Sequence, residues 1–437
     1  MSYTPMQGYY APPTHSPQPG YNRPPPGPPG QYPPRGYQQY PQQQQQQQQQ
    51  GFGAPPPGQY PPQQNYPPQQ QNYPQQQFGQ PPQSYPQQYG AQPQSYPPPQ
   101  QYGAPQYGMQ QPYSAPTPPS PGYDSRQVPM PYPIDSAAEE LRKAMKGFGT
   151  NETVLIQALV RPDPVQMAAI RAAYLRRHNR DLEKDVEKET SGYFQKGLLS
   201  LVRGPLLQDV YNLDKALKGA GTKESLLDDV ILGRTNADMH AIKEAYRLKI
   251  GRPLEKDIAD DLSLKTEMLF KMVLSAQRAE ESAPIIPQSI DQDVDRLHKA
   301  MHGAGGTNQL EVCDIISSRS SGQLRAISGR YHEKFHKDLD KTIEKSFSGH
   351  MESALLELLR AGADPAMKDA MALEAAMKGI GTKDYLLVQR LVRAHWNRDH
   401  MQMVKGAYRH RYKKELAERV RGETSGDFGK LCLALVG

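Results

Sequence analysis

Met145-Lys146-Gly147-Phe148-Gly149-Thr150 is a short turn bracketed by glycines, and the segment NETVLIQALV that follows it has the apolar spacing of a helix. The turn returns as LKGAGT at 217–222 and MKGIGT at 377–382. A version with one more glycine, MHGAGGT, occupies 301–307. A pattern that recurs four times in one chain indicates internal duplication.

Segments with helical periodicity surround each turn in the same order. In the first copy a helix precedes the turn, and NETVLIQALV, PVQMAAIRAAYLRRH, RDLEKDVEKE and YFQKGLLSLV follow it. This predicts five short helices in about 70 residues, with Thr150 as the N-cap of the second. We therefore expect an all-α array of four similar repeats.

A tyrosine followed eight residues later by a leucine fixes the register between the copies. The tyrosines are Tyr174, Tyr246, Tyr331 and Tyr408, and the intervals between them are 72, 85 and 77 residues. We expect these anchors to pack in the core of each repeat. The long second interval indicates a linker at 280–290. The predicted repeats span 134–204, 205–279, 291–362 and 363–437.

Residues 1–133 have a different composition, rich in Pro, Gln, Tyr and Gly, with nine consecutive glutamines at 42–50. So little apolar side chain cannot offset the entropy of ordering, so this segment is predicted to be a disordered tail. Two interpretations stay open. The tail either self-associates or recruits proteins that bind proline motifs, or it is a spacer without a fixed partner.

Charge and cysteine content narrow the classes of function. The chain has 51 basic and 45 acidic residues, a mixed-sign balance that is untypical of nucleic-acid binders, so no nucleic-acid partner is expected. Cys313 and Cys432 lie in apolar helical segments and are predicted to be buried free thiols. No apolar run approaches the roughly 18 residues of a membrane span, and the first residues lack the features of a signal peptide. We expect a cytoplasmic protein that meets membranes peripherally.

Four copies in register, each with a Gly-x-Gly-Thr turn or a variant of it, resemble the annexin family over residues 135–437. The first third resembles the tails of the long-tailed annexins. The resemblance implies four five-helix repeats in a slightly curved disc, with ion-binding loops on its convex face. It also implies calcium-dependent binding of anionic phospholipid membranes and no enzymatic activity.

The first turn supplies one half of the calcium site that the resemblance implies. Calcium prefers roughly six to eight oxygen ligands, and glycines allow a turn to aim successive carbonyls inward. The carbonyls of Met145, Gly147 and Gly149 are the candidates here. Glu189, 42 residues after Gly147, stands where the family has a bidentate acid.

The other copies keep this donor set to different degrees. The candidate ligands are Leu217, Gly219, Gly221 and Asp261 in the second copy and Met377, Gly379, Gly381 and Glu423 in the fourth. The second acid is followed by Leu-Ser-Leu in place of Thr-Ser-Gly, so a site with poorer loop geometry is expected there. The fourth copy is two residues longer, and we place the extra residues in a loop at 393–400. In the third copy Ser346 stands at the acid position, which predicts a site that does not bind.

Residues around the glycines are candidates for contact with lipid. Phe148 and Ile380 either insert among lipid headgroups or pack back on their helices. Lys146, Lys218 and Lys378 either meet lipid phosphate or are simply solvated.

A cluster of histidines in the fourth copy is a weaker candidate for a metal site. His395, His400 and His410 surround Trp396, but their spacing fits no common zinc pattern, and we expect a polar surface loop there. We can place no catalytic constellation in the array. A condensate-forming scaffold that tethers partners to membranes or cytoskeleton stays open, as does passage of ions along a central polar path.

Overall fold

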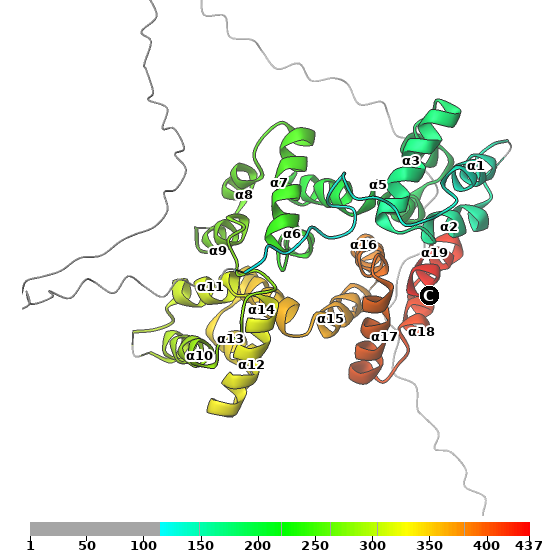
Figure 1. Ribbon diagram of the computed structural model, residues 1–437. Helices are drawn as coiled ribbons and strands as arrows, with labels where there is room; N and C mark the ends of the chain where they lie inside the picture. The colour runs from blue at the N-terminus through cyan, green and yellow to red at the C-terminus, as the bar shows by residue number, and fades with distance from the viewer. Residues whose placement is uncertain (1–113, 148, 220, 263, 304, 380) are drawn as a thin grey trace, which may run out of the picture. The chain divides into compact units, whose positions relative to one another are not determined.

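The computed structural model describes residues 114–437 except 148, 220, 263, 304 and 380, and Figure 1 shows its helices in chain order. These residues form nineteen helices and no strand. The first repeat contains α1 (Ile134–Ala144), α2 (Glu152–Val160), α3 (Pro164–His178), α4 (Leu182–Glu189) and the first half of α5 (Gly192–Leu217). The second contains the rest of α5, α6 (Glu224–Ile231), α7 (Asn236–Ile250), α8 (Leu254–Asp261) and α9 (Leu264–Leu274).

The last two repeats also contain five helices each. The third contains α10 (Pro287–His302), α11 (Gln309–Ser318), α12 (Ser321–Phe335), α13 (Leu339–Ser346) and α14 (Gly349–Ala363). The fourth contains α15 (Pro365–Met377), α16 (Asp384–His395), α17 (Arg398–Tyr412), α18 (Leu416–Glu423) and α19 (Gly426–Val436). The predicted all-α class and the five helices per repeat are confirmed.

The long helix α5 joins two repeats through a kink. Gly204 has φ 72° and ψ 175°, a conformation that L side chains disfavour, and Pro205 follows it without a backbone N–H. The break at 204–205 divides α5 into the last helix of the first repeat and the first helix of the second.

The structure describes the chain from residue 114 on, which is before the predicted end of the tail at 133. Residues 1–113 lie outside the described residues, but 114–133, which we call the strap, packs on the repeats. Tyr123 is buried, and the Ser120 amide donates to Asp238 Oδ1 at 2.8 Å. The prediction was wrong for the strap because it weighed average composition, whereas one aromatic ring and a few paired hydroxyls hold the segment.

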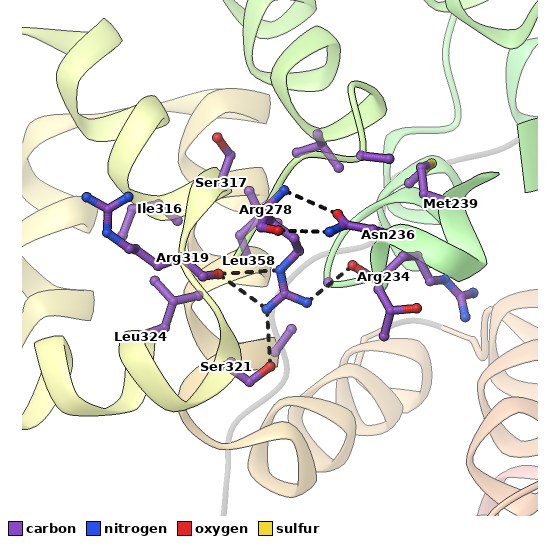
Figure 2. Close-up of a pocket in the computed structure, with 16 residues that line it drawn as sticks. Arg234, Asn236, Met239, Arg278, Ile316, Ser317, Arg319, Ser321, Leu324 and Leu358 are labelled. Carbon is purple, nitrogen blue, oxygen red and sulfur yellow. Dashed lines mark hydrogen bonds between the residues drawn. The ribbon is translucent and has the colours of Figure 1, made fainter. Parts of the chain in front are cut away.

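The connection between the second and third repeats spans 275–286, so the last residues of the predicted linker at 280–290 belong to α10. Arg278 of this connection donates to the backbone carbonyls of Arg234 and Arg319, each at 3.3 Å (Figure 2). These bonds tie the second repeat to the third.

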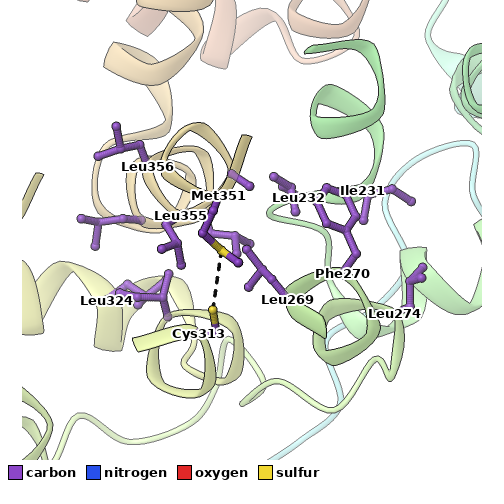
Figure 3. Packing of buried hydrophobic residues seen from close by; sticks show 14 of the residues in the cluster. Ile231, Leu232, Leu269, Phe270, Leu274, Cys313, Leu324, Met351, Leu355 and Leu356 are labelled. Atoms are coloured by element: carbon purple, nitrogen blue, oxygen red, sulfur yellow. Dashed lines mark hydrogen bonds between the residues drawn. The ribbon is translucent and has the colours of Figure 1, made fainter. Parts of the chain in front are cut away.

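The buried apolar side chains of the described residues form two cores. The second and third repeats share one, part of which Figure 3 shows, and the first and fourth repeats share the other. The four anchor tyrosines are each at most 1% exposed. Cys313 and Cys432 are buried free thiols, as predicted, and burial raises their pKa values to about 11 and about 12.

Most of the predicted polar loop at 393–400 is helical, because α16 continues to His395 and α17 begins at Arg398, so that only 396–397 connect them. His395 is 1% exposed at the end of α16, and both its ring nitrogens lie 2.9 Å from backbone carbonyl oxygens. His400 Nε2 lies 2.6 Å from Asp369 Oδ2. Compared with α2, α16 is three residues longer and its connection to the next helix is one residue shorter, which accommodates the two extra residues. The prediction was wrong because it followed the charged residues of this segment, whereas the buried face of α16 continues to the last residue of the helix.

Within the described residues, no helix combines the length and the apolar character needed to cross a membrane.

Candidate metal sites in the repeated turns

Three of the four turns share the same pair of positive φ angles at their glycines. The φ angles are 116° and 83° at Gly147 and Gly149, 112° and 81° at Gly219 and Gly221, and 118° and 81° at Gly379 and Gly381. A β carbon added at any of them would meet no atom within 4 Å. Backbone conformation, and not lack of space, therefore requires glycine at these positions.

The third turn differs from the others. Of its glycines only Gly306 has a positive φ, 87°. The closing hydrogen bond runs from the Asn308 amide to the Ala300 carbonyl, whereas in the first turn it runs from Asn151 to Ala144. The extra glycine thus lengthens the closed loop by one residue.

The helix after the first turn is capped one residue later than predicted. Asn151 is the N-cap of α2, and its side chain accepts a hydrogen bond from the Val154 amide at 3.0 Å. Thr150 instead directs its hydroxyl at the loop that follows α4. Its Oγ1 lies 3.2 Å from the Glu189 carbonyl oxygen and 3.5 Å from Glu189 Oε2.

The threonine of the turn contacts the distant acid in each of these three repeats. Thr222 donates to the Asp261 carboxylate, and the Thr382 hydroxyl lies 2.5 Å from Glu423 Oε2. The structure thus brings together each predicted acid and its turn across about 40 positions of sequence. Within the described part of the third repeat, no such bond joins Thr307 to Ser346.

The acids occupy equivalent places because each is the last residue of the fourth helix of its repeat. Directly after Glu189, the Thr190 amide and hydroxyl both donate hydrogen bonds to the Val186 carbonyl, at 3.1 and 2.6 Å. In the second repeat Leu262 keeps the backbone bond, to Ile258 at 3.0 Å, but has no hydroxyl. The helix end is therefore preserved where the sequence departs from Thr-Ser-Gly.

The three acids differ in charge environment. Glu189 is exposed, and Asp261 and Glu423 are half-buried. Glu423 forms an ion pair, whereas neither Glu189 nor Asp261 forms one with any residue that the structure describes. Glu423 is paired with Arg419, and the Thr382 hydroxyl and this guanidinium hold the pKa of Glu423 below its usual range.

Arg419 also donates a hydrogen bond to the turn, a contact that the sequence analysis did not predict. Its Nη2 donates to the Met377 carbonyl at 2.7 Å, while its Nη1 contacts Glu423. A carbonyl and a carboxylate that were predicted as ligands thus converge on one cationic group. The register offered a signal, because Arg419 follows Tyr408 by the same eleven residues that separate Asp185 from Tyr174.

The donor set fits a hard divalent cation. A carboxylate and backbone carbonyls are the oxygen ligands that calcium prefers, and in the fourth repeat they already surround a positive charge. The side chains of Met145 and Met377 are buried, so these residues offer only their carbonyls.

The basic residues of the turns lie at the surface. Lys146, Lys218 and Lys378 are exposed, and only Lys218 has an acidic neighbour among the described residues, Asp214 at 3.9 Å. Phe148 and Ile380, the predicted loop tips, lie outside the described residues.

Comparison with known proteins accounts for this arrangement. The sequence profile of the annexin family matches residues 136–201, 208–272, 292–358 and 368–435. Annexin C1 of Cryptococcus neoformans var. grubii is 38% identical over 431 residues, covering 97% of this chain and 83% of its own. Annexin A13 of Mus musculus is 35% identical over 306 residues, covering 70% and 95%.

Solved structures agree with the sequence comparisons. Annexin III superimposes with a TM-score of 0.67 at 27% identity, covering 73% of this chain and 98% of its own. A calcium-bound annexin (Sm)1 gives a TM-score of 0.63 at 26% identity, covering 74% and 93%. Because the profile matches four times, over more than half of the sequence, the chain belongs to the annexin family of calcium-dependent phospholipid-binding proteins.

Proposed function

We propose that the chain binds calcium with the turns of its first, second and fourth repeats and docks through the bound ions on membranes rich in anionic phospholipid. One observation carries the proposal: in the fourth repeat the Met377 carbonyl and the Glu423 carboxylate converge on a single cationic group. The threonine–acid contacts of the first and second repeats support the same donor arrangement there. The calcium in the related annexin (Sm)1 structure supports the identity of the metal.

The ligand count explains why a membrane enters the site. Three carbonyls and one bidentate carboxylate leave positions open on an ion that takes roughly six to eight oxygens. Water fills them in solution, and a lipid phosphate oxygen replaces water at a membrane, so that the metal bridges the two. Lys146, Lys218 and Lys378 add about 1 kcal/mol each near an anionic surface.

The third repeat is proposed to bind no calcium at its turn. Ser346 has no charge to hold the ion, and its turn lacks the paired positive φ angles of the others. The chain is thus proposed to have three calcium sites, which differ in their acid and in its surroundings.

Co-sedimentation with vesicles of phosphatidylserine and phosphatidylcholine tests the proposal. The full chain is expected to sediment with vesicles in calcium and to stay in solution with a chelator. A chain carrying Glu189→Gln, Asp261→Asn and Glu423→Gln together is expected to lose sedimentation at calcium levels that suffice for the wild type.

Two substitutions serve as controls for that experiment. Glu187→Gln removes an exposed acid two residues before Glu189, and Ser346→Ala changes the third repeat. Both are expected to leave the calcium requirement unchanged. Equal sedimentation with and without calcium, or an unchanged requirement in the triple variant, would overturn the proposal.

Residues 1–113 lie outside the described part of the chain, and their sequence is rich in Pro, Gln, Tyr and Gly. We propose that they bring membranes together once the repeats have docked, and a condensate-forming scaffold is the second candidate role. Light scattering of a vesicle suspension distinguishes an effect of residues 1–113 on vesicle aggregation from docking of the repeats on single vesicles. A chain that starts at residue 114 is expected to bind vesicles but to aggregate them less than the full chain does.

A further inference from the structure

The fourth turn already contains a positive charge of the protein's own. Arg419, on α18, is ion-paired with Glu423 and donates from Nη2 to the Met377 carbonyl at 2.7 Å. Its Nε also reaches Glu374 Oε2 of α15, at 3.4 Å. One guanidinium thus spans the acid, the turn and the helix that leads into the turn.

Other repeats have no basic residue at this register. Counting eleven residues from each anchor tyrosine gives Asp185, Asp257, Thr342 and Arg419. In the first two repeats this residue is an acid that accepts the tyrosine hydroxyl, at 2.8 and 2.6 Å.

In the fourth repeat the anchor tyrosine has a different partner. The Tyr408 hydroxyl donates to Glu374 of α15, so an acid from another helix has taken over the role of the missing aspartate. Arg419 is left to contact the turn. Glu374 contacts both the Tyr408 hydroxyl and Arg419, so a residue of another helix holds the guanidinium beside the turn.

A guanidinium and a calcium ion compete for the same oxygens. Glu423 and the Met377 carbonyl would have to release Arg419 before they coordinate a metal, and the released arginine would add a positive charge beside the ion. Glu189 and Asp261 form no ion pair among the described residues, so the first and second sites carry no such cost.

We propose that Arg419 is an internal cation that occupies the fourth site and lowers its calcium affinity below that of the first and second sites. The fourth turn is then the last to fill, and it joins the membrane only at higher calcium. This inference rests on the proposed function, because it concerns the regulation of one of its sites.

Calorimetric titration of calcium without lipid isolates the effect. The starting protein is the full chain carrying Glu189→Gln and Asp261→Asn, in which the fourth site is the one that keeps its acid. Adding Arg419→Gln is expected to tighten calcium binding by about tenfold, because two charge-assisted contacts no longer oppose the metal.

Arg421→Gln in the same background is the matched control. Arg421 is exposed on the same helix and has no ion pair or side-chain hydrogen bond among the described residues, so its removal changes the net charge equally. Equal affinities of the Arg419→Gln and Arg421→Gln chains would overturn the inference.

A second variant guards against loss of folding, which circular dichroism monitors. Arg419→Lys keeps the charge but offers a single ammonium group in place of the fork that reaches both oxygens. Its calcium affinity is expected between those of the starting protein and the Arg419→Gln chain. An affinity no tighter than the starting protein's, in a folded chain, would count against the inference.

The two proposals fail differently. If the wild-type chain binds no calcium, the proposed function itself is wrong. If the wild type binds calcium through its first two sites but Arg419→Gln does not tighten the fourth, only the role of Arg419 is wrong.

Discussion

At the scale of single residues, the turns depend on glycine for its backbone and not for its size. Gly147 has φ 116°, and a β carbon there would meet nothing within 4 Å. Gly147→Ala is expected to cost about 1–3 kcal/mol of unfolding free energy and to weaken calcium binding, because the alanine strains the turn or opens it. Urea denaturation and calorimetry measure the two effects.

Gly406 provides the opposite case within the same chain. It lies inside α17, and an added β carbon would again meet nothing within 4 Å. Gly406→Ala is expected to stabilise the protein by about 0.5–1 kcal/mol, since alanine is the better helix former. Substitutions at Gly147 and Gly406 that shift stability in the same direction would contradict this account of the turn.

At the scale of helices, the start of the second helix is not equivalent in all repeats. Asn151 caps α2 with its side chain, and Asn308 caps α11 in the same way. The corresponding residues before α6 and α16 are Lys223 and Lys383, which make no side-chain cap bond. A side-chain cap therefore stabilises the start of this helix in the first and third repeats but not in the second and fourth.

Replacing the cap tests this difference. Asn151→Ala is expected to cost about 1 kcal/mol of unfolding free energy, because the Val154 amide loses its acceptor. Lys383→Ala, at the same place in the fourth repeat, removes no cap and is expected to change stability by less than about 0.5 kcal/mol. Thermal unfolding of both variants measures the effect, and equal losses would argue against it.

The helices could be predicted from the sequence because their signals are local. Apolar spacing, glycine turns and the tyrosine anchors all act within one repeat. Arg419 could not be placed in the same way, because its partners Met377 and Glu374 lie about 40 positions earlier in the sequence and belong to another helix. The buried His395 was missed for the same reason: its partners Val160 and Leu435 come from two other segments.

At the scale of the whole described unit, the strap joins elements that belong to different cores. The Tyr123 hydroxyl donates to Asp209 of α5 at 2.5 Å. The same carboxylate accepts from Arg234, before α7, and from Arg393 of α16, at 2.6 and 2.8 Å. Asp209 thereby connects the strap, the second repeat and the fourth repeat.

Truncation separates the strap from the rest of the first third. A chain that starts at residue 114 keeps Tyr123 and its partners, and we expect it to unfold at the temperature of the full chain. A chain that starts at 134 loses a buried aromatic ring, worth about 3 kcal/mol, and leaves Asp209 with two arginines only. Its midpoint is expected to fall by about 5 °C. Differential scanning calorimetry compares the three chains, and equal midpoints for the two truncated forms would show that the strap contributes nothing to stability.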